Sequence, residues 1–361
     1  TSLALSLLRH SAHTNESFVF SPFSLNTALS IVHDGAEGDT QKELTNLLLK
    51  GCTPSDVTNF YSSLAHSQSR TSKSKVLFKS ANRLYVNHST PIEASYQIHI
   101  QSKYDVKVDS FNLRDKAGSA NKINHFVKTS TNGKIGNIVN AEEIDNCTAA
   151  ILINAIHFLG KWKKSFESAG PDFFKGVTGE RMIEFMATTN NFRVNWNNEF
   201  GTFLIVPYQD KKFNFFYLMP KESSNLENMK KRLTGGKLVN IMKQAKLELV
   251  EIFVPKFKLE SELHAKEALQ KMGMKTLFNE LLANLSKISH KHLFISKIKH
   301  KAVIEVNEQG TEAAAVTEGD HGIQIDEDGD DSPSIPIIFI DRPFLFGILR
   351  NDHIFFLGQY V

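Results

Sequence analysis

The chain has 361 residues, of which 41% are hydrophobic and 22% charged, and these values exclude a disordered or fibrous protein. Its formal net charge is +3, from 42 basic and 39 acidic residues, which argues against a dedicated nucleic-acid binder. Two cysteines, Cys52 and Cys147, are too few for a disulfide scaffold, and we expect both thiols to be free and buried.

The first hundred residues are predicted to be mainly helical, and another helix is expected after them. Ser21 is a suitable N-cap before Pro22, and apolar residues follow at helical spacing. Further helices are expected at residues 37–49, 54–64, 92–103 and 116–130. One strand is expected between the second and third of these, at residues 76–86.

Strands are predicted to dominate the rest of the chain. The apolar run at residues 149–158 fits a strand buried on both faces. Other strands are expected at residues 181–194, 203–206, 213–218, 246–254, 299–306, 335–340, 344–349 and 354–358, and short helices at 239–243 and 263–272. This mixture predicts an α+β fold with several antiparallel sheets, and because no linker is evident we expect one domain over residues 1–361.

The longest apolar run is too short to cross a bilayer, so we expect no membrane span. No secretory signal is visible, but the chain starts directly in a helical pattern and we expect that its N-terminus has been truncated. Extracellular and cytoplasmic locations both stay open.

Residues 310–334 interrupt this pattern with a long connection rich in Gly, Ala, Asp and Glu, a kind that is usually functional or disordered. In an extended chain alternate residues share a face. One face would be small and uncharged, with Thr311, Ala313, Ala315, Thr317 and Gly319, while every charge lies on the other. Because Ala and Gly are poor strand formers, this pattern favours a loop that becomes a strand when a sheet opens. A flexible, Ala-rich surface loop is the alternative.

The second half of this connection is strongly acidic. Mutual repulsion should keep its five carboxylates extended and solvated; they are Asp326, Glu327, Asp328, Asp330 and Asp331. A calcium loop starting at Asp326 would need Gly at the sixth position and Glu at the twelfth, where this chain has Asp331 and Ile337. We therefore expect no calcium site.

Six segments carry a family resemblance. They read FSPFSL at 20–25, NAIHFLGKW at 154–162, VPKFK at 254–258, MGM at 272–274, EQGTEAAA at 308–315, and RPFLF with FFLG at 342–346 and 355–358. In this order they make the chain resemble the serpins over essentially its whole length. The resemblance implies a single α+β domain, with about nine helices around three β-sheets and an exposed reactive loop at about residues 310–334.

The resemblance also implies a function. Inhibitory serpins are suicide substrates: a serine protease cleaves the loop, is trapped as an acyl-enzyme, and the loop inserts into the central sheet. The matching hinge residues are Glu308, Gly310, Thr311, Ala313, Ala314 and Ala315. The inward-facing ones carry neither charge nor proline, either of which would hinder insertion, so the pattern favours an inhibitor. A non-inhibitory serpin with a carrier, chaperone or storage role is the alternative.

Five other residues match positions that govern sheet opening in this family. Ser21, Ser24, Asn154 and His300 match polar residues beneath the central sheet, and a hydrogen-bonded cluster is expected because buried polar groups need partners. Trp162 matches the tryptophan near the point where insertion begins, and plain core packing is its alternative role.

The cleaved bond can be counted in two ways. The family's usual spacing from the hinge gives Gln324–Ile325, whereas counting back from Pro343 gives Ser332–Pro333. The two counts differ by eight residues, so an insertion of that size is expected in the loop. We prefer Gln324–Ile325, because the length of the inserted segment fixes how far the protease is carried. The target protease is not readable from these residues.

Other functions are less well supported. The chain has no G-x-S-x-G, H-E-x-x-H or P-loop motif, so we expect no enzyme, cofactor or metal site, and we interpret His290 and His292 as part of a solvated turn. The expected partner is a serine protease, in a covalent 1:1 complex with a monomeric chain. A basic run suggests weak polyanion binding, with a solvated surface as the alternative; it consists of Arg70, Lys73, Lys75 and Lys79.

The near-neutral net charge conceals an uneven distribution. Residues 302–341 contain 11 acidic residues and no Lys or Arg. The other 321 residues carry 42 basic and 28 acidic groups, a formal charge of +14. We hypothesise that the acidic segment steers proteases with basic surfaces toward the loop.

Overall fold

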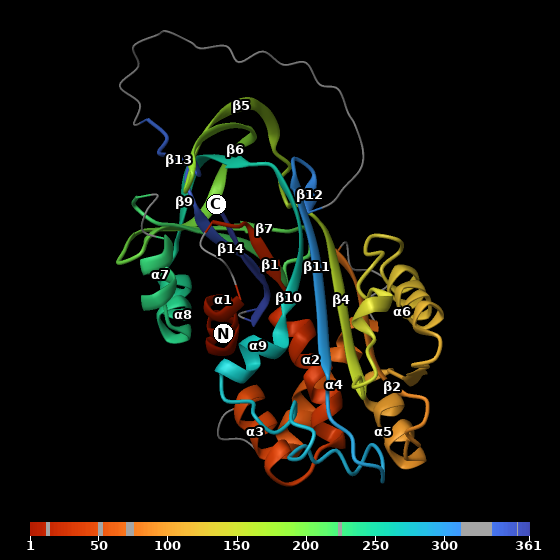
Figure 1. Ribbon diagram of the computed structural model, residues 1–361. Coiled ribbons are helices and arrows are strands. Elements are labelled where there is room, and N and C mark those ends of the chain that lie inside the picture. Colours follow the sequence, from red (N-terminus) through yellow and green to blue (C-terminus); the bar gives the residue numbers. More distant parts are fainter. Residues whose placement is uncertain (12–14, 50–52, 70–75, 223–225, 312–333, 352) are drawn as a thin grey trace.

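The helices and strands that follow come from a computed structural model, which describes residues 1–361 except 12–14, 50–52, 70–75, 223–225, 312–333 and 352 (Figure 1). The described part contains nine α-helices and a short 3-10 helix, η1. They are α1 (Ser2–Ser11), α2 (Pro22–Gly35), α3 (Gly38–Leu48), α4 (Pro54–Ser69), α5 (Ala94–Tyr104), α6 (Lys116–Ser130), η1 (Ala141–Glu143), α7 (Leu226–Arg232), α8 (Gly235–Gln244) and α9 (Ala265–Lys271).

Six strands form the central sheet. In spatial order they are β10 (Phe257–His264), β11 (Lys297–Asn307), β12 (Gly310–Thr311), β4 (Ala150–Lys161), β2 (Val76–Asn87) and β3 (Val108–Phe111). Strand β11 also pairs directly with β4, in parallel, below the point where β12 lies between them.

The other nine strands form a second hydrogen-bonded sheet. Eight of them follow one path: β1 (Phe18–Phe20), β15 (His353–Tyr360), β14 (Phe344–Arg350), β8 (Phe213–Met219), β7 (Gly201–Pro207), β6 (Gly179–Asn198), β9 (Lys246–Pro255) and β13 (Ile337–Phe339). The ninth, β5 (Glu167–Gly176), pairs with β6.

The α+β class is confirmed, but the described strands form two hydrogen-bonded sheets where three were expected. The reason is the length of β6, which has 20 residues. One part of β6 pairs with β5 and β9, and its end pairs with β7, so two expected sheets share this strand and are continuous.

Three apolar clusters fix the central sheet in place. Its lower half packs on α2 and the neighbouring helices through Leu152 and Ile298. Its upper half packs on the second sheet through residues such as Phe158 and Ile304. The opposite face is covered by α6, which contacts Tyr85 and other buried residues of β2 and β4 (Figure 1).

Two expectations about the chain can be compared with this fold. Cys147 is exposed, so the prediction that it is buried was wrong: it lies in a surface turn where its backbone N–H donates to Asp145. Cys52 lies outside the described residues. No helix in the described ranges is both long and apolar enough to cross a membrane.

Candidate functional site

The central sheet has a seam between β4 and β11. The two strands pair in parallel from Lys297 opposite Ile151 to Val303 opposite His157. Above this point they separate, and β12 lies between them, antiparallel to both. The first two residues of the long connection, Gly310 and Thr311, are therefore already strand residues of the sheet.

Both residues are closely fitted to their place. A Cβ atom on Gly310 would lie 2.0 Å from the carbonyl oxygen of Gly160, so only glycine lets the two backbones approach this closely. Thr311 is fully buried, and its hydroxyl is 2.6 Å from the hydroxyl of Tyr208. Thr311 thus occupies the inward-facing position that its place in the alternating pattern predicts.

An aromatic and ionic frame surrounds the start of β12. The indole N–H of Trp162 donates to the carbonyl of Asn307 at 2.8 Å, and its ring stacks on Tyr208 with centroids 4.6 Å apart. Glu308 forms an ion pair with Lys256 at 2.9 Å. Burial lowers the pKa of Lys256, but its bonds and charge interactions with Glu308 and Glu184 outweigh this and leave the pKa raised. Trp162 is therefore both a core residue and a neighbour of the hinge.

The polar cluster predicted beneath the sheet is present. The Asn154 amide donates to the hydroxyl of Ser24 at 2.6 Å and to the side-chain oxygen of Asn82. The Ser21 hydroxyl donates to the carbonyl of Phe355 at 2.6 Å and accepts from the Ser24 N–H at 3.1 Å. The cluster joins α2 to β2, β4 and β15.

His300 completes the cluster from the other side of the seam. Its Nε2 accepts a hydrogen bond from the Ser21 N–H at 3.0 Å, so its Nδ1 carries the proton and donates to the Asn154 side-chain oxygen. His300 is fully buried, and this burial lowers its pKa to about 3. The imidazole is therefore neutral at physiological pH, with a defined tautomer.

Three contributors to the site were missed in the sequence. Asn82 lies directly opposite Asn154 in the pairing of β2 with β4. Asn82 is a polar residue inside an apolar strand, and this signal in the sequence could have identified it. Tyr208 and Lys256 come from β-rich segments more than 40 residues away from Trp162 and Glu308 in the sequence, and only the folded sheets bring them together.

Several predicted residues lie outside the described ranges. These are Ala313, Ala314, Ala315, Gln324, Ile325, the acidic run at 326–331, and Arg70, Lys73 and Lys75. Lys79 is exposed on β2. His290 lies 2.9 Å from Glu93 and His292 bonds to the carbonyl of Glu280, and no group of three or more potential metal ligands occurs among the described residues.

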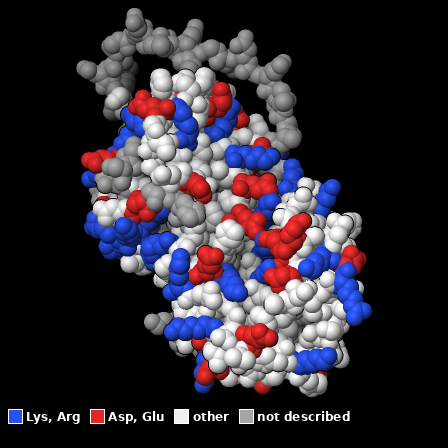
Figure 2. Space-filling model, viewed as in Figure 1, with Lys and Arg blue, Asp and Glu red and all other residues white. Residues whose placement is uncertain are grey.

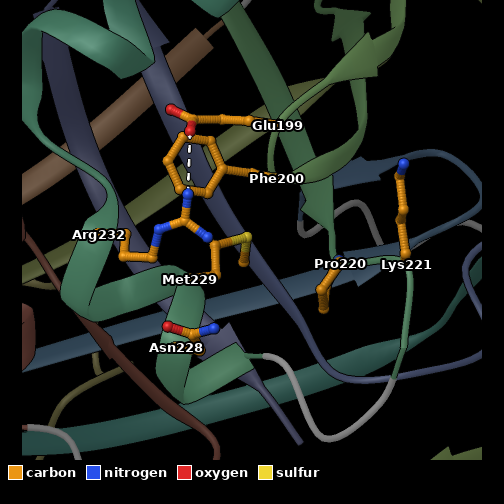
Figure 3. A pocket seen from close by; sticks show the side chains of 7 residues that line it. All are labelled: Glu199, Phe200, Pro220, Lys221, Asn228, Met229 and Arg232. Atoms are coloured by element: carbon orange, nitrogen blue, oxygen red, sulfur yellow. Dashed lines mark hydrogen bonds and ion pairs between the residues drawn. The ribbon is translucent and has the colours of Figure 1, made fainter.

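A small pocket lies away from the seam, as Figure 3 shows. Its walls come from the turn between β6 and β7, the segment after β8, and α7. The Arg232 guanidinium is 3.2 Å from the Glu199 carboxylate, so these two charges of the pocket neutralise each other. None of its lining residues belongs to β4, β11 or β12.

Comparison with known proteins explains this arrangement. The family model described as "Serpin (serine protease inhibitor)" matches residues 1–361. The chain belongs to the serpin family. This serpin is 30% identical to Serpin B6 of Pongo abelii, over 99% of this chain and 96% of that protein. It is 31% identical to leukocyte elastase inhibitor A of Mus musculus, over 98% and 94% of the two chains.

A solved serpin structure has the same fold. The structure of native protease nexin-1 with heparin superposes with a TM-score of 0.86 at 25% identity, over 99% of this chain and 96% of that one.

Proposed function

We propose that this serpin inhibits a serine protease as a suicide substrate. The protease cleaves the loop after Gln324, remains attached as an acyl-enzyme, and is carried away as the loop inserts between β4 and β11. The observation that carries this proposal is the position of β12: two hinge residues already lie in the gap, antiparallel to both neighbours.

The register of β12 predicts where the following residues would go if insertion continued. Continued insertion places Ala313 between Ile304 and Phe158, and Ala315 between Ala302 and Ile156. All four of these neighbours are fully buried. Small side chains at the inward positions can enter this interior without leaving an unpaired polar group, whereas a charge there would cost several kcal/mol, about 2–7 for a polar group and more for an ion.

Insertion in the same register would bring Thr317 between His300 and Asn154. Insertion would separate these two side chains, which now bond to each other. The Thr317 hydroxyl can both donate and accept, so it supplies each of them with a new partner. The polar cluster would then stabilise both the closed sheet and the expanded sheet. Between these two states its hydrogen bond from His300 to Asn154 would be broken.

The hinge can be tested with Thr311→Arg. An arginine in this buried position would have no counter-charge and would oppose insertion, so we expect the protease to cleave the loop and leave. Thr311→Ser, which keeps a hydroxyl for Tyr208, is the matched control and should still form an SDS-stable complex. A stable complex with Thr311→Arg would contradict insertion at this seam. Mass spectrometry of the released C-terminal fragment identifies the cleaved bond.

The same assay separates the two classes of serpin. One molecule of an inhibitory serpin is consumed for each protease molecule that it inactivates, and the inactivation is irreversible. A carrier or storage serpin is cleaved without inactivating the protease.

We further propose weak polyanion binding through Arg70, Lys73, Lys75 and Lys79. The exposed position of Lys79 and the heparin in the protease nexin-1 structure support this.

A further inference from the structure

The chain contains four motifs of the form Asn-x-Ser/Thr, the acceptor sequence for N-linked glycans. Their asparagines are Asn15, Asn87, Asn146 and Asn284. So short a motif arises easily by chance, and the inference therefore depends on where the motifs lie in the fold. Asn15, Asn146 and Asn284 are exposed, whereas Asn87, the last residue of β2, is half-buried.

Three of these asparagines lie at one end of the molecule, here named the far end: the start of α3, the end of β2, the turn before β4 and the segment between α9 and β11. Asn146 is in the turn before β4, and the N–H of Asn87 donates to the carbonyl of Ala149 at 2.9 Å. The carbonyl of Asn284 accepts from the Glu37 N–H beside α3. Figure 1 shows α3 at the opposite end from β12 and β13. Strand β4 runs about 35 Å from the far end to its pairing with β12.

An exposed thiol stands beside one of these acceptors. Cys147 is the middle residue of the Asn146 motif, and it is a free cysteine at the surface. Exposed thiols are prone to oxidation and to mixed disulfides, so a soluble protein gains from covering them. Asn146 is itself exposed, and a bulky, hydrated glycan attached there would shield its neighbour.

Two exposed leucines stand beside the second acceptor. Leu281, at 87%, is the most exposed large apolar side chain among the described residues, and Leu282 is 59% exposed. They lie in a turn where both of their N–H groups donate to the Asn279 side-chain oxygen. Adjacent apolar side chains in water are an aggregation hazard unless something covers them. Asn284 follows in the same segment, so a glycan on it would lie next to the leucines.

The two motifs differ in when they could be modified. Each motif requires a hydroxyl at its third residue. Thr148 is only 1% exposed, and its hydroxyl donates to Asp145 at 2.9 Å, so Asn146 must be modified before this turn folds. Ser286 stays exposed in the folded chain, where its hydroxyl donates to the Asn284 side-chain oxygen at 2.8 Å.

We propose that Asn146 and Asn284 carry N-linked glycans that cover the thiol and the leucine pair of the far end. In the reaction, the Nδ2 atom of each asparagine forms a bond to the anomeric carbon of an oligosaccharide carried on a lipid pyrophosphate. The bond from that carbon to the pyrophosphate breaks, the lipid pyrophosphate leaves, and Nδ2 loses one proton. The chain then passes through the secretory pathway, and its glycans leave the end with β12 free for a protease.

The direct test examines the chain isolated from the organism that makes it. Peptide N-glycosidase in heavy-oxygen water converts each glycosylated asparagine into an aspartate that carries the heavy isotope, and peptide mass spectrometry locates it. We expect this label at Asn146 and at Asn284. If either asparagine is found unmodified, the proposal is overturned.

The shielding of the thiol is tested with full-length chains secreted from eukaryotic cells. Asn146→Gln should react with a bulky maleimide at Cys147 severalfold faster than the parent chain, as measured by mass spectrometry of the labelled peptide. Asn15→Gln is the matched control, because its motif lies away from the far end: the Ser17 hydroxyl accepts from the Val361 N–H at 3.0 Å. Equal rates for Asn146→Gln and the parent chain would contradict the shielding.

The covering of the leucines is tested with a hydrophobic dye. Asn284→Gln should bind more dye than the parent chain, and adding Leu281→Ser and Leu282→Ser to it should remove the increase. Glycosidase treatment of the folded parent chain should raise both dye binding and thiol reactivity, which separates loss of the glycans from misfolding of a variant. Deglycosylated chain with unchanged dye binding and thiol reactivity would overturn the covering role.

Discussion

His300 connects, through single hydrogen bonds, the two strands that must separate and the helix beneath them. Its ring accepts from Ser21 on one side and donates to Asn154 on the other. A second proton on the ring would face the Ser21 N–H, a donor. Protonation of His300 is therefore incompatible with the closed cluster, and the native fold holds this histidine neutral.

This arrangement predicts how stability depends on pH. The unfolded chain binds a proton at His300 below about pH 6.5, whereas the folded chain does so only near its lowered pKa of about 3. Stability is therefore lost as pH falls from about 6.5 toward 3, by about 1.4 kcal/mol per pH unit. The free energy of unfolding, measured in urea between pH 7 and 4.5, should therefore depend less steeply on pH in His300→Gln. The difference in slope should correspond to the uptake of one proton.

His157 provides the comparison for that experiment. Burial, with smaller contributions from Lys134 and Lys258, lowers its pKa to about 4. His300→Gln should therefore lose one histidine's share of the parent slope and keep the share of His157. If His300→Gln keeps the full slope, the neutral state of His300 in the fold is refuted.

Single residues also show what the sequence could predict. The residues Ser21, Ser24, Asn154 and His300 come together as expected, because they stand in recognisable segments. Asn82 was not foreseen, since its role depends on register with β4, and strand register is a property of two segments together.

At the scale of elements, the proposed function depends on the seam between β4 and β11. Seven residue pairs hold it closed below β12. Ile156 and Ala302 lie directly opposite each other in this parallel pairing, on the face toward the second sheet. Neighbouring strands lie about 4.8 Å apart, which is within the Cα separation that a disulfide spans.

A disulfide across the seam should therefore act as a reversible lock. In Ile156→Cys/Ala302→Cys the oxidised protein cannot admit a strand, and we expect the protease to cleave it without being trapped. Reduction should restore complex formation, measured on SDS gels, and each single-cysteine variant serves as control. Equal trapping by oxidised and reduced protein would show that the seam is not the insertion site.

Elements with strong periodicity could be predicted, and others could not. Strand β10 was missed because Ser261 interrupts its apolar alternation; the buried Ser261 hydroxyl accepts from the Val19 N–H at 3.1 Å. Strand β5 was missed because nearly all of it is exposed and its sequence has no apolar face. The continuity of the second sheet through β6 depends on strand pairing, which no single segment reveals.

At the scale of the whole molecule, charge is divided between the body and the region of the loop. Figure 2 shows lysine and arginine side chains spread over the described face, most densely at the left of the view. Residues 302–341 carry 11 acidic and no basic side chains. A protease with a basic surface near its cleft would be attracted to this region and repelled elsewhere.

Neutralising the acidic run should therefore slow association. Replacing Asp326, Asp328, Asp330 and Asp331 by Asn, and Glu327 by Gln, should lower the inhibition rate constant for such a protease by about tenfold at low salt. The salt dependence should become flatter, because screening acts on the removed charges. An unchanged rate constant and salt dependence would leave the run as a solvated spacer.

The central claim is that the loop becomes a strand of the sheet after cleavage. An inserted strand of about ten residues adds about 1 kcal/mol of net hydrogen bonding per residue, about 10 kcal/mol in total. For a chain of this length that corresponds to a rise of about 20 °C or more in the unfolding temperature, at about 2 °C per kcal/mol.

The measurement is the thermal unfolding temperature of the intact and the loop-cleaved chain, with cleavage confirmed by mass spectrometry. We expect the cleaved chain to unfold about 20 °C or more above the intact one, and cleaved Thr311→Arg to show little of this rise. A cleaved chain that unfolds at the temperature of the intact one would contradict strand insertion and, with it, inhibition by the proposed mechanism.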